Sequence, residues 1–496
     1  MAVTTTPLLG LGSLSRLPAG SHPLVRPGDV PAGIVHLGLG AFHRAHQAVY
    51  TEEAIAAAGG DWGIIGVAPR SAQIVADLWA QDRLFSVTTM SGEGAGTRVV
   101  GSLAGVRHAA ADPGAVVALL ADPAVRVVTL TITEKGYRLD PSTGRLTVDA
   151  DLRADLNTDR APVTIPGLLL RGLLARCRAD AGPIAVLSCD NLPSNGRRVR
   201  SLVEQARELV AGDSAGFGEW LGASVTFPGS MVDRIVPAST PATLELAAAA
   251  LGARDLAAVH GEPYRQWVIE DRFPGGRPAW EAAGAVLTDD AGPWERLKLR
   301  TLNGVHSAVA YLGALAGRET IAAALEIPGM RAAMTRFVAE DVAGSLEPPP
   351  GVSVVGYGDS VLDRFADPAI AHRTRQVAMD GTQKLPQRVL HTIADRRAAG
   401  ASPRWAALVV AAWMRYVQGT ADDGQALPLD DPLADRIRER LAAAPSTPAG
   451  VAHALFGLDT VFPPELATDE TVRALVVEWL TALDKHGVEA TLAGAA

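Results

Sequence analysis

The sequence predicts an α/β protein in which an N-terminal Rossmann-type domain precedes a mostly α-helical domain. In the first part of the chain, short apolar strands alternate with helical segments, which is typical of βα units that build a parallel sheet. After about residue 285, strand-like runs become rare and helical periodicity dominates. We therefore place the two domains at residues 1–285 and 286–496.

The expected elements follow from the pattern of apolar residues. The strands are expected at Gly33–Leu37, Gly63–Val67, Val125–Ile132 and Ile184–Ser188. The helices are expected from just after His46 to about Ala58 and then over Ser71–Ala80, Pro113–Leu120 and Ile165–Arg178. Residues 1–30 lack periodicity and are predicted to be a surface lead-in, and Pro348–Gly351 is predicted to be a loop. In the second domain, one buried helix face is indicated by Val472, Leu475, Val476, Trp479, Leu480 and Leu483.

Composition and charge exclude several classes of partner. The chain has 496 residues and a net charge of −9, and a nucleic-acid partner would require a basic surface instead. The longest apolar run, Ala406–Met414, is too short to span a bilayer. Cys177 and Cys189 form neither a disulfide framework nor a metal cluster. No secretory signal is evident, so we expect a cytoplasmic enzyme that acts on a small molecule, of unknown oligomeric state.

A glycine turn follows the first expected strand. Gly38 and Gly40 fill the first two places of G-x-G-x-x-G, and His43 stands in the third. The two glycines allow a tight turn and a close approach of the backbone to a pyrophosphate at the helix N-terminus. The strand before and the helix after the turn favour a dinucleotide site over a purely structural turn. The imidazole of His43 means that this helix and strand cannot pack as closely as a glycine permits.

The choice between NAD and NADP does not follow from the residues. The acid that binds the ribose hydroxyls of NAD is expected about twenty residues after the turn, but it is not evident. Asp61 precedes the second strand, and Asp77 lies well inside the next helix. Arg70, just after the second strand, could meet a 2′-phosphate or could be a solvated turn residue.

The segment Glu295–His306 contains the residues that suggest catalysis. On a helix with about 100° per residue, Glu295, Lys298, Asn303 and His306 fall within an arc of roughly 140°. An amine, an amide and an imidazole on one face can take a proton from an alcohol and stabilise the resulting oxyanion. A solvated polar face is the alternative. A second polar motif, Asn191–Gly196 (NLPSNG), strengthens the catalytic interpretation.

These motifs together resemble the mannitol dehydrogenase family of polyol-specific long-chain dehydrogenases and reductases. Lys298, Asn303 and His306 have the spacing K-x4-N-x2-H, which is specific when combined with D-N-L-P-x-N-G, and the family shares the F-H-R-A-H that leaves His43 in the third glycine place. The matching segments, spread over most of the chain, are Ile34–Tyr50, Thr129–Tyr137, Ser188–Gly196, Phe227–Pro237, Glu295–His306 and Asp380–Arg388.

The resemblance implies a metal-independent enzyme that uses NAD, with NADP not excluded, to interconvert a secondary alcohol and a ketone. It implies that Lys298 is the general acid/base, that Asn191 and Asn303 hold the reacting oxygen, and that His306 orients the substrate. Glu295 is expected to connect the lysine to solvent. The cofactor contacts implied are Gly38, Gly40, Phe42, His43, Arg44, Thr133, Glu134 and Lys135, and Asp233 is a substrate contact.

The physics of a lysine base is consistent with these roles. A free lysine has a pKa of about 10.4 and is a poor base at neutral pH. Burial in a closed cleft disfavours the ammonium form, as does a nearby helix N-terminus. Asp289, Asp290 and Pro293 look like a helix start just before Lys298. We therefore expect an active site between the two domains, with Lys298 kept away from bulk water.

The substrate is suggested by a cationic segment, His372–Arg388. It resembles fructuronate reductases (mannonate oxidoreductases) more than mannitol 2-dehydrogenases. A sugar carboxylate needs a cation, so we expect Arg373, Lys384 and Arg388 to bind the carboxylate and hydroxyls of D-mannonate or D-fructuronate. A basic helix face that serves solubility is the alternative for each of the three.

Other functions stay open at this point. The substrate could be mannitol, another polyol or altronate. A non-catalytic dinucleotide sensor is a rival of another class, although a sensor has no need of Lys298, Asn303, His306 and Asn191. A metal-dependent alcohol dehydrogenase would need a cluster of ligands with zinc spacing, and none is visible.

Overall fold

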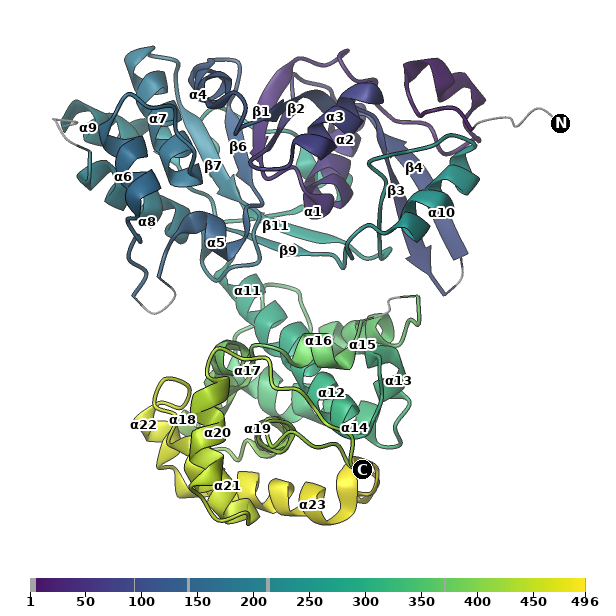
Figure 1. Ribbon diagram of the computed structural model, residues 1–496, viewed down its shortest axis with the longest axis vertical. Coiled ribbons are helices and arrows are strands. Elements are labelled where there is room, and N and C mark those ends of the chain that lie inside the picture. Colours follow the sequence, from purple (N-terminus) through teal and green to yellow (C-terminus); the bar gives the residue numbers. More distant parts are fainter. Residues whose placement is uncertain (1–5, 93, 141–142, 211–214, 370–371, 496) are drawn as a thin grey trace. The chain divides into compact units, whose positions relative to one another are not determined.

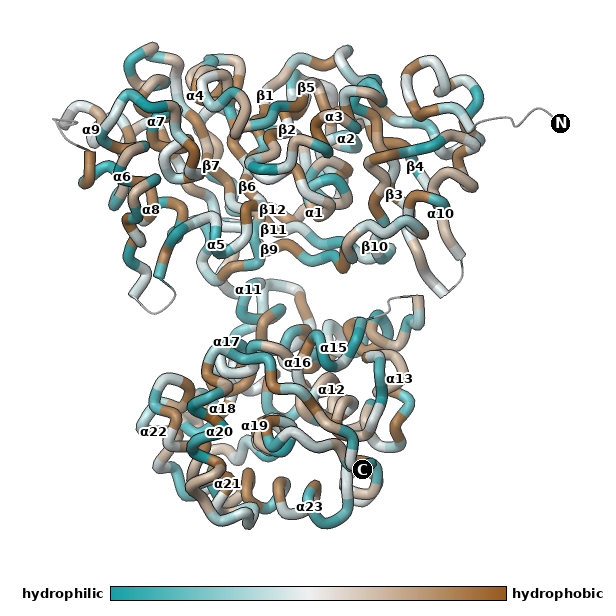
Figure 2. Tube along the Cα trace, viewed as in Figure 1, coloured by the Kyte–Doolittle hydropathy of each residue, from teal (hydrophilic) through white to brown (hydrophobic). Residues whose placement is uncertain are grey.

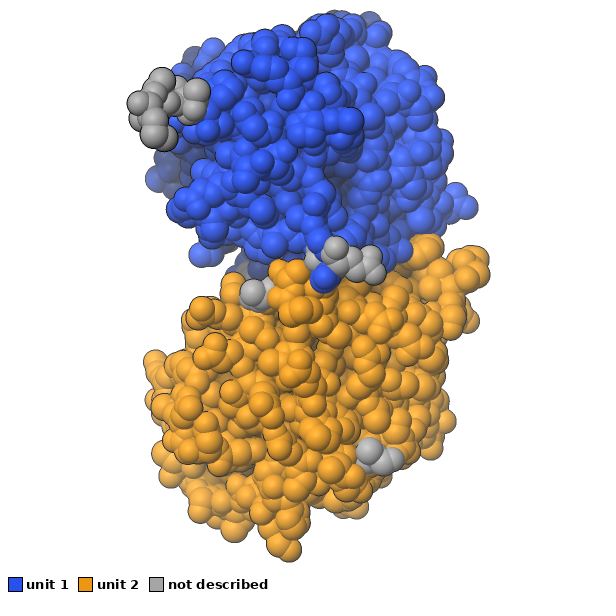
Figure 3. All heavy atoms as spheres, turned by 90° about the vertical axis from the view of Figure 1, so that its right-hand side faces the viewer, with its two compact units in different colours: residues 1–292 blue, residues 293–496 orange. Residues whose placement is uncertain are grey.

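The computed structural model describes residues 6–92, 94–140, 143–210, 215–369 and 372–495. The chain forms two compact units, Met1–Gly292 and Pro293–Ala496, which are distinguished by colour in Figure 3. The first is an α/β unit and the second is mostly helical, so the predicted fold class is confirmed. None of the described helices is both long and apolar enough to cross a membrane.

A parallel six-stranded sheet organises the first unit (Figure 1). Its strand order is β5-β2-β1-β6-β7-β8, which is the order of a doubly wound Rossmann sheet. Strands β1, β2, β6 and β7 arise from the four apolar runs expected from sequence. The bounds are β1 Ala32–Leu37, β2 Gly63–Ala68, β5 Leu103–His108, β6 Val127–Leu130, β7 Ile184–Ser188 and β8 Val225–Thr226.

Hydrophobic cores lie on both faces of this sheet. Because side chains alternate along a strand, Ile34 of β1 belongs to one core and Val35 and Leu37 belong to the other. Every residue of β6 and β7 is buried, and Figure 2 shows the apolar character of these central strands. The helical segments of this unit are η1 Leu11–Arg16, α1 Ala41–Ala45, α2 Gln47–Ala58, α3 Ala72–Ala80, α4 Pro113–Ala121, α5 Thr133–Tyr137, α6 Ala150–Asn157, α7 Ile165–Arg178, α8 Asn195–Glu208, α9 Ala215–Ser224, α10 Pro241–Leu251 and η2 Trp280–Ala283.

The direction of the strand order reverses between β1 and β6. Chain segments leave these two neighbouring strands in opposite directions, which opens a crevice at their carboxyl ends. Gly38 follows β1 and Thr131 follows β6, so both lie at this switch point. The topology therefore places the glycine turn where ligands of open α/β sheets bind.

Two three-stranded sheets complete the first unit. One has the order β10-β3-β4 and the other has the order β12-β11-β9. These sheets were not predicted from the sequence, and their strands are short apart from β4, which contains glycines, and β3, which has seven residues and no glycine. Their bounds are β3 Phe85–Ser91, β4 Gly94–Val100, β9 Ser230–Asp233, β10 Val259–Gly261, β11 Gln266–Glu270 and β12 Val286–Thr288.

One expectation for the N-terminal region is wrong. Residues 1–5 lie outside the described residues, but Leu9, Leu14 and Leu17 are buried in a small core with Leu84, so this part is no surface lead-in. The helical stretch expected after His46 to about Ala58 is confirmed as α2. It starts at Gln47 because the backbone at His46 leaves the helical region (φ −125°, ψ −87°) and ends the short helix α1. The compact units divide after Gly292, and β12 pairs with β11 of the first unit, while the domain boundary at residue 285 stays a prediction.

The second unit is a bundle of helices around two that are buried on nearly all sides. These are α12 and α19, which pack against each other, and α19 also packs along α23. The predicted loop at Pro348–Gly351 is confirmed. The bounds are α11 Gly292–Lys298, α12 Gly304–Leu315, α13 Ile321–Leu325, α14 Met330–Arg336, η5 Ala343–Ser345, α15 Val354–Phe365, α16 Thr374–Ala378, α17 Gly381–Leu385, α18 His391–Ala398, α19 Arg404–Tyr416, α20 Ala434–Ala442, α21 Pro448–Phe456, α22 Pro464–Ala467 and α23 Glu470–Ala495.

Three π-helical stretches interrupt these helices: η3 Leu299–Asn303, η4 Phe337–Val342 and η6 Pro386–Leu390. The stretch η3 packs against both of the others. The uniform α-helix expected over Glu295–His306 is therefore wrong at its centre. In a π turn the backbone bonds join residues five apart, and such turns occur frequently at functional sites.

Candidate active site

A cavity of about 390 Å³ lies at the switch point of the first unit. Gly38 has a φ of 110°, and a side chain there would overlap the carbonyl oxygen of Thr131, so the turn requires glycine. Gly40 has an ordinary φ of −94°, and a methyl group on its Cα would come no closer than 3.6 Å to another atom. Gly40 therefore serves the close approach of a ligand rather than the conformation of the turn.

Two stacked imidazoles, from the strand before the glycine turn and the helix after it, pack beside the turn. The ring centroids of His36 in β1 and His43 in α1 are 3.4 Å apart, and the rings are inclined by 12°. Both side chains are fully buried. His43 thus fills the place of the third glycine with a ring that stacks on the ring of His36 from the strand.

The hydrogen bonds of His36 fix its tautomer and the turn. Its Nε2 lies 3.0 Å from the carbonyl oxygen of Gly38, which can only accept. Nε2 therefore carries the hydrogen, and Nδ1 accepts from the Thr129 hydroxyl at 2.8 Å. The Thr131 hydroxyl donates to the same Gly38 carbonyl at 2.8 Å. These bonds hold the first glycine of the turn against both central strands.

Acid should destabilise this unit because the buried imidazoles resist protonation. Burial lowers the pKa of His36 from 6.5 to about 3 and the pKa of His43 well below 6.5. As pH falls below 6.5 the unfolded chain binds protons that the folded chain does not, so stability present at neutral pH is progressively lost. Each histidine contributes a slope of up to about 1.4 kcal/mol per pH unit. Burial raises the pKa of Glu52 from 4.5 to about 7. Between these pH values the folded chain binds this proton more readily than the unfolded chain, so Glu52 makes stability rise as pH falls.

We expect the free energy of unfolding, measured by urea titration, to fall between pH 6.5 and pH 4.5. The variant His43→Phe keeps an aromatic ring on His36 and should reduce the slope by up to about 1.4 kcal/mol per pH unit. An unchanged slope in this variant would contradict the assignment of the acid sensitivity to the buried pair.

The expected cofactor residues divide into two groups in the structure. Gly38, Gly40, Thr133 and Lys135 line the cavity. Phe42, His43, Arg44 and Glu134 are absent from its described wall. Phe42 stacks on His46 with 5.0 Å between ring centroids, and Arg44 is buried with Nη1 3.4 Å from the Leu39 carbonyl oxygen. These two side chains therefore pack within the protein next to the glycine turn and do not line the cavity.

Asp190 anchors the loop that carries Thr133. Its carboxylate accepts hydrogen bonds from the backbone N–H groups of Ile132 (3.1 Å) and Thr133 (2.9 Å). The Tyr137 hydroxyl donates to it at 2.6 Å. Burial raises the pKa of Asp190, and the hydrogen bond from Tyr137 opposes that rise. Thr133 has a φ of 64°, a strained conformation for a β-branched residue, and the carboxylate holds it there.

Asn195 joins the loop of Asn191 to the strand of Asp233. Its Nδ2 donates to the carbonyl oxygens of Asp190 (3.1 Å) and Ser230 (2.8 Å), and its Oδ1 accepts from the Ser230 N–H at 2.9 Å. Ser230 begins β9, which ends at Asp233. Asp233 is buried and Asn191 is exposed. One buried amide therefore fixes two of the expected site residues relative to each other.

Replacing Asn195 with alanine should weaken both stability and catalysis. It leaves buried backbone groups without partners, which should lower the free energy of unfolding by about 2–3 kcal/mol. The loop of Asn191 loses its anchor to β9, so we expect kcat/KM to fall about tenfold or more. Urea denaturation and steady-state rates measure the two effects. Asn157→Ala, at an exposed position on α6, is the control, and wild-type values in both variants would contradict the anchoring role.

In the second unit, Lys298 and Asn303 flank the π-helical stretch η3. Lys298 ends α11 and Asn303 ends η3, and both residues are only 6% exposed. In a regular α-helix residues five apart, as these two are spaced, would lie about 140° apart. The wider π turn reduces this angle, because its backbone bonds join residues five apart. Glu295 is partly exposed, one turn earlier on α11.

His306 stands among cations. Burial lowers its pKa well below 6.5, and His372, Arg388, Lys384 and Arg364 lower it further. Its ring is tilted against Phe365, with 4.6 Å between centroids, and lies 5.3 Å from the ring of His372. Its Nε2 is buried and has no hydrogen-bond partner among the described residues. A neutral imidazole with an unused nitrogen can bind a hydroxyl of a ligand.

The three expected substrate cations have different surroundings. Arg388 in η6 donates from Nη1 to the Ser307 hydroxyl at 3.0 Å and to the Asn303 carbonyl oxygen at 3.4 Å. Nζ of Lys384 donates to the carbonyl oxygens of Val377 and Met379 at the end of α16. Arg373 is exposed, and its backbone forms a bridge to Thr320 and accepts a hydrogen bond from the Val377 N–H at 3.1 Å. Arg388 and Lys384 thus join His306, whereas Arg373 does not.

The sequence assigned no role to several residues that shape these sites. Asp190 and Asn195 lie inside the motif that contains Asn191, so their types and positions were a usable signal. His372 lies in the same cationic segment, but the pattern of charges predicts a substrate role only for Arg373, Lys384 and Arg388. Arg364, on α15, is distant in sequence from the catalytic segment and has no local signal at all.

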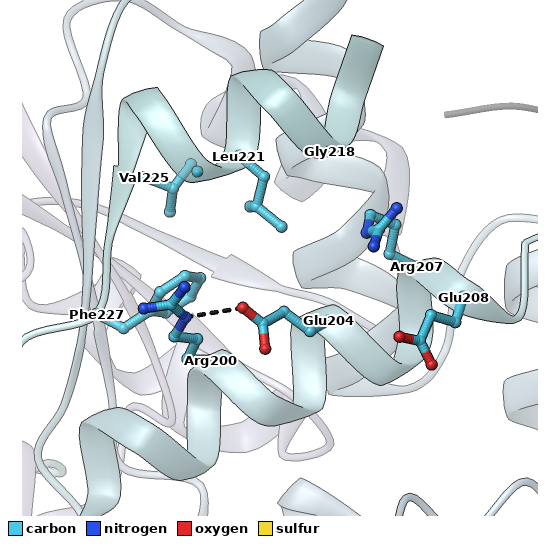
Figure 4. Close-up of a pocket in the computed structure, with 9 residues that line it drawn as sticks. Arg200, Glu204, Arg207, Glu208, Gly218, Leu221, Val225 and Phe227 are labelled. Atoms are coloured by element: carbon cyan, nitrogen blue, oxygen red, sulfur yellow. Dashed lines mark hydrogen bonds and ion pairs between the residues drawn. The ribbon is translucent and has the colours of Figure 1, made fainter. Parts of the chain in front are cut away.

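A second cavity of the first unit contains none of the expected residues. It measures about 240 Å³ and lies between α8 and α9 (Figure 4). Arg200 and Glu204 form an ion pair of 2.7 Å there, and both are well exposed. Their charges cancel, so this cavity offers little for a charged ligand.

Comparison with known proteins extends these observations over the whole chain. The family model described as the mannitol dehydrogenase Rossmann domain matches residues 32–282, and the one described as the mannitol dehydrogenase C-terminal domain matches residues 290–484. D-mannonate oxidoreductase of Escherichia coli is 38% identical, with 90% of this chain and 92% of the relative covered. Mannitol 2-dehydrogenase of Cereibacter sphaeroides is also 38% identical, with 93% and 95% covered.

A solved structure shares the fold of both units. It is the ternary complex of Pseudomonas fluorescens mannitol 2-dehydrogenase with NAD and D-mannitol, which is 34% identical, with a TM-score of 0.82. The similarity covers 98% of this chain and 99% of that one. Both family models match in sequence order, and the glycine turn and the lysine segment lie within them. The chain belongs to the mannitol dehydrogenase family of oxidoreductases.

Proposed function

We propose that the protein interconverts D-mannonate and D-fructuronate with NAD(H). As a member of its family it is an NAD-dependent oxidoreductase that acts on an alcohol group of a polyol or sugar acid. The finer assignment, to a sugar acid, rests on one observation: the cations around His306. A carboxylate is stabilised by cations in a partly buried site, and an arginine can bind it with two parallel hydrogen bonds.

The proposed mechanism assigns each polar group one task. Lys298 takes the proton from the substrate hydroxyl. A nicotinamide cofactor held at the glycine turn of Gly38 and Gly40 would supply the hydride acceptor when bound. The amides of Asn303 and Asn191 donate to the reacting oxygen and stabilise its negative charge without titrating themselves. His306 binds a neighbouring hydroxyl through its unused Nε2. Glu295, being partly exposed, passes the proton from the lysine to solvent.

The acid end of the substrate is assigned to Arg388. This guanidinium bonds the backbone of Asn303, so it lies beside a group that holds the reacting oxygen. Lys384 contributes positive charge, but its amine is already used in two bonds to carbonyl oxygens. Arg373 is retained as a weaker candidate because its side chain is exposed. Mannitol is the second candidate substrate, since a mannitol 2-dehydrogenase is as similar in sequence as the mannonate enzyme.

A substrate panel tests the proposal. Mannonate, altronate, mannitol and arabinitol are each oxidised with NAD and with NADP, and fructuronate and fructose are reduced in the opposite direction. We expect kcat/KM for mannonate to exceed that for mannitol at least tenfold. Faster turnover of mannitol than of either aldonate would reject the sugar acid. Tight dinucleotide binding without turnover of any compound would favour a sensor instead.

Arg388→Gln gives a sharper test within the same panel. It removes the cation but keeps hydrogen-bond donors toward Ser307. If Arg388 binds the carboxylate, kcat/KM for mannonate should fall at least tenfold more than kcat/KM for mannitol. Arg331→Ala, which removes an exposed arginine paired with Asp363, is the matched control and should change neither rate. An equal loss on both substrates would leave Arg388 with a structural role only.

A further inference from the structure

The cavity of the first unit lacks an acid where NAD enzymes usually have one. In Rossmann folds a carboxylate near the end of the second strand accepts hydrogen bonds from the adenosine ribose, and an arginine nearby accommodates a 2′-phosphate. Here β2 ends at Ala68, and the next residues in the cavity wall are Pro69, Arg70 and Ser71. All ionisable side chains in the described wall are cations, namely Arg70, Lys135 and Arg138.

The nearest acids are placed elsewhere. Asp61 precedes β2 and is therefore at its opposite end. Asp77 lies in the middle of α3, where it accepts a hydrogen bond from Gln73 Nε2 at 2.7 Å, and it is not part of the described wall. Neither carboxylate is available at the end of β2 to accept from ribose hydroxyls or to repel a phosphate.

Arg70 and Ser71 form a defined cationic corner. The Arg70 carbonyl oxygen lies 3.1 Å from Nε2 of His108, the last residue of β5, so the backbone of this turn is tied to the neighbouring strand. The Arg70 side chain is exposed, so its guanidinium can reach a ligand in the cavity. Ser71 is the N-cap of the nine-residue helix α3, yet its hydroxyl makes no capping bond. A guanidinium, a hydroxyl and the amides of a helix N-terminus are the donors that phosphates prefer.

We propose that this corner binds the 2′-phosphate of NADP, so that the enzyme uses NADP(H) as well as NAD(H), with Arg70 and Ser71 as specificity-determining residues. The inference rests on the proposed dinucleotide-dependent activity but not on the identity of the sugar. The phosphate carries a charge of about −1.5 to −2 at neutral pH, as phosphate monoesters do. Arg70 supplies the opposing charge and Ser71 a hydrogen-bond donor, while the cavity contributes no carboxylate that would oppose them.

Binding without any sugar substrate tests this inference separately from the reaction. Titration of the full-length protein with NADH and with NADPH, followed by cofactor fluorescence, gives the two Kd values. We expect wild-type Kd values for the two cofactors within tenfold of each other. Arg70→Ala should weaken NADPH at least fivefold more than it weakens NADH. Arg70→Asp should shift the ratio further toward NADH, because a carboxylate binds ribose hydroxyls and repels phosphate.

The control is Arg178→Ala, which removes an exposed arginine from the far end of α7 in the same unit. It should leave the ratio of the two Kd values unchanged, which excludes a general effect of net charge. A wild-type Kd for NADPH more than tenfold above that for NADH overturns the inference, as does a change in the ratio below fivefold in Arg70→Ala. If neither cofactor binds, the proposed function itself fails.

Discussion

Replacing Lys298 with alanine should lower kcat by about a thousandfold, the scale of a lost general acid/base. Lys298 is only 6% exposed and immediately precedes the π-helical stretch that ends at Asn303, so it is shielded from bulk water. If the lysine acts as the base, a small primary amine added to the assay should restore part of the rate. A merely structural role would give no such rescue.

Lys485→Ala is the matched control for this variant, because it removes an exposed lysine of the same unit. It should keep wild-type rates. Circular dichroism and urea denaturation of both variants show whether the fold is kept. More than a tenth of wild-type kcat in Lys298→Ala would remove the lysine from the proposed mechanism.

Replacing Gly38 with alanine should abolish dinucleotide binding and lower the free energy of unfolding by about 3 kcal/mol or more. The residue combines a φ of 110° with direct contact to the Thr131 backbone, so a methyl group strains the chain and also displaces the neighbouring loop. That loop leads to Thr133, which lines the same cavity. Isothermal calorimetry with NADH and urea denaturation measure the two losses.

Gly40→Ala separates the two functions of the glycines. Its backbone is ordinary and its surroundings are open, so this variant should cost less than about 1 kcal/mol of stability. It should still weaken NADH binding, because the methyl group stands where a pyrophosphate would approach. Equal stability of the wild type and Gly38→Ala would contradict the geometry of the turn.

Local patterns predicted the parts of the fold that local forces control. The helix α7 (Ile165–Arg178) and the strand β7 (Ile184–Ser188) have the predicted bounds, because a Thr164 cap followed by proline starts the helix and a short, continuous apolar run is a buried strand. The loop and sheet contacts of Asn195 were not predictable, since they join residues 190, 195 and 230 across the fold. Periodicity contains no information on such distant partners.

The sequence alone determined the class of this protein: a Rossmann sheet with a glycine turn, followed by a helical unit that contains a lysine, an amide and an imidazole at fixed spacing. These features depend on short-range backbone preferences and on residue types. Only the tertiary structure decided that His43 rests on His36, that the catalytic segment passes through a π turn packed on two others, and that Arg388 rather than Arg373 stands with His306. The reason is physical, because the burial, partners and helix geometry of these groups are set by segments far away in the chain.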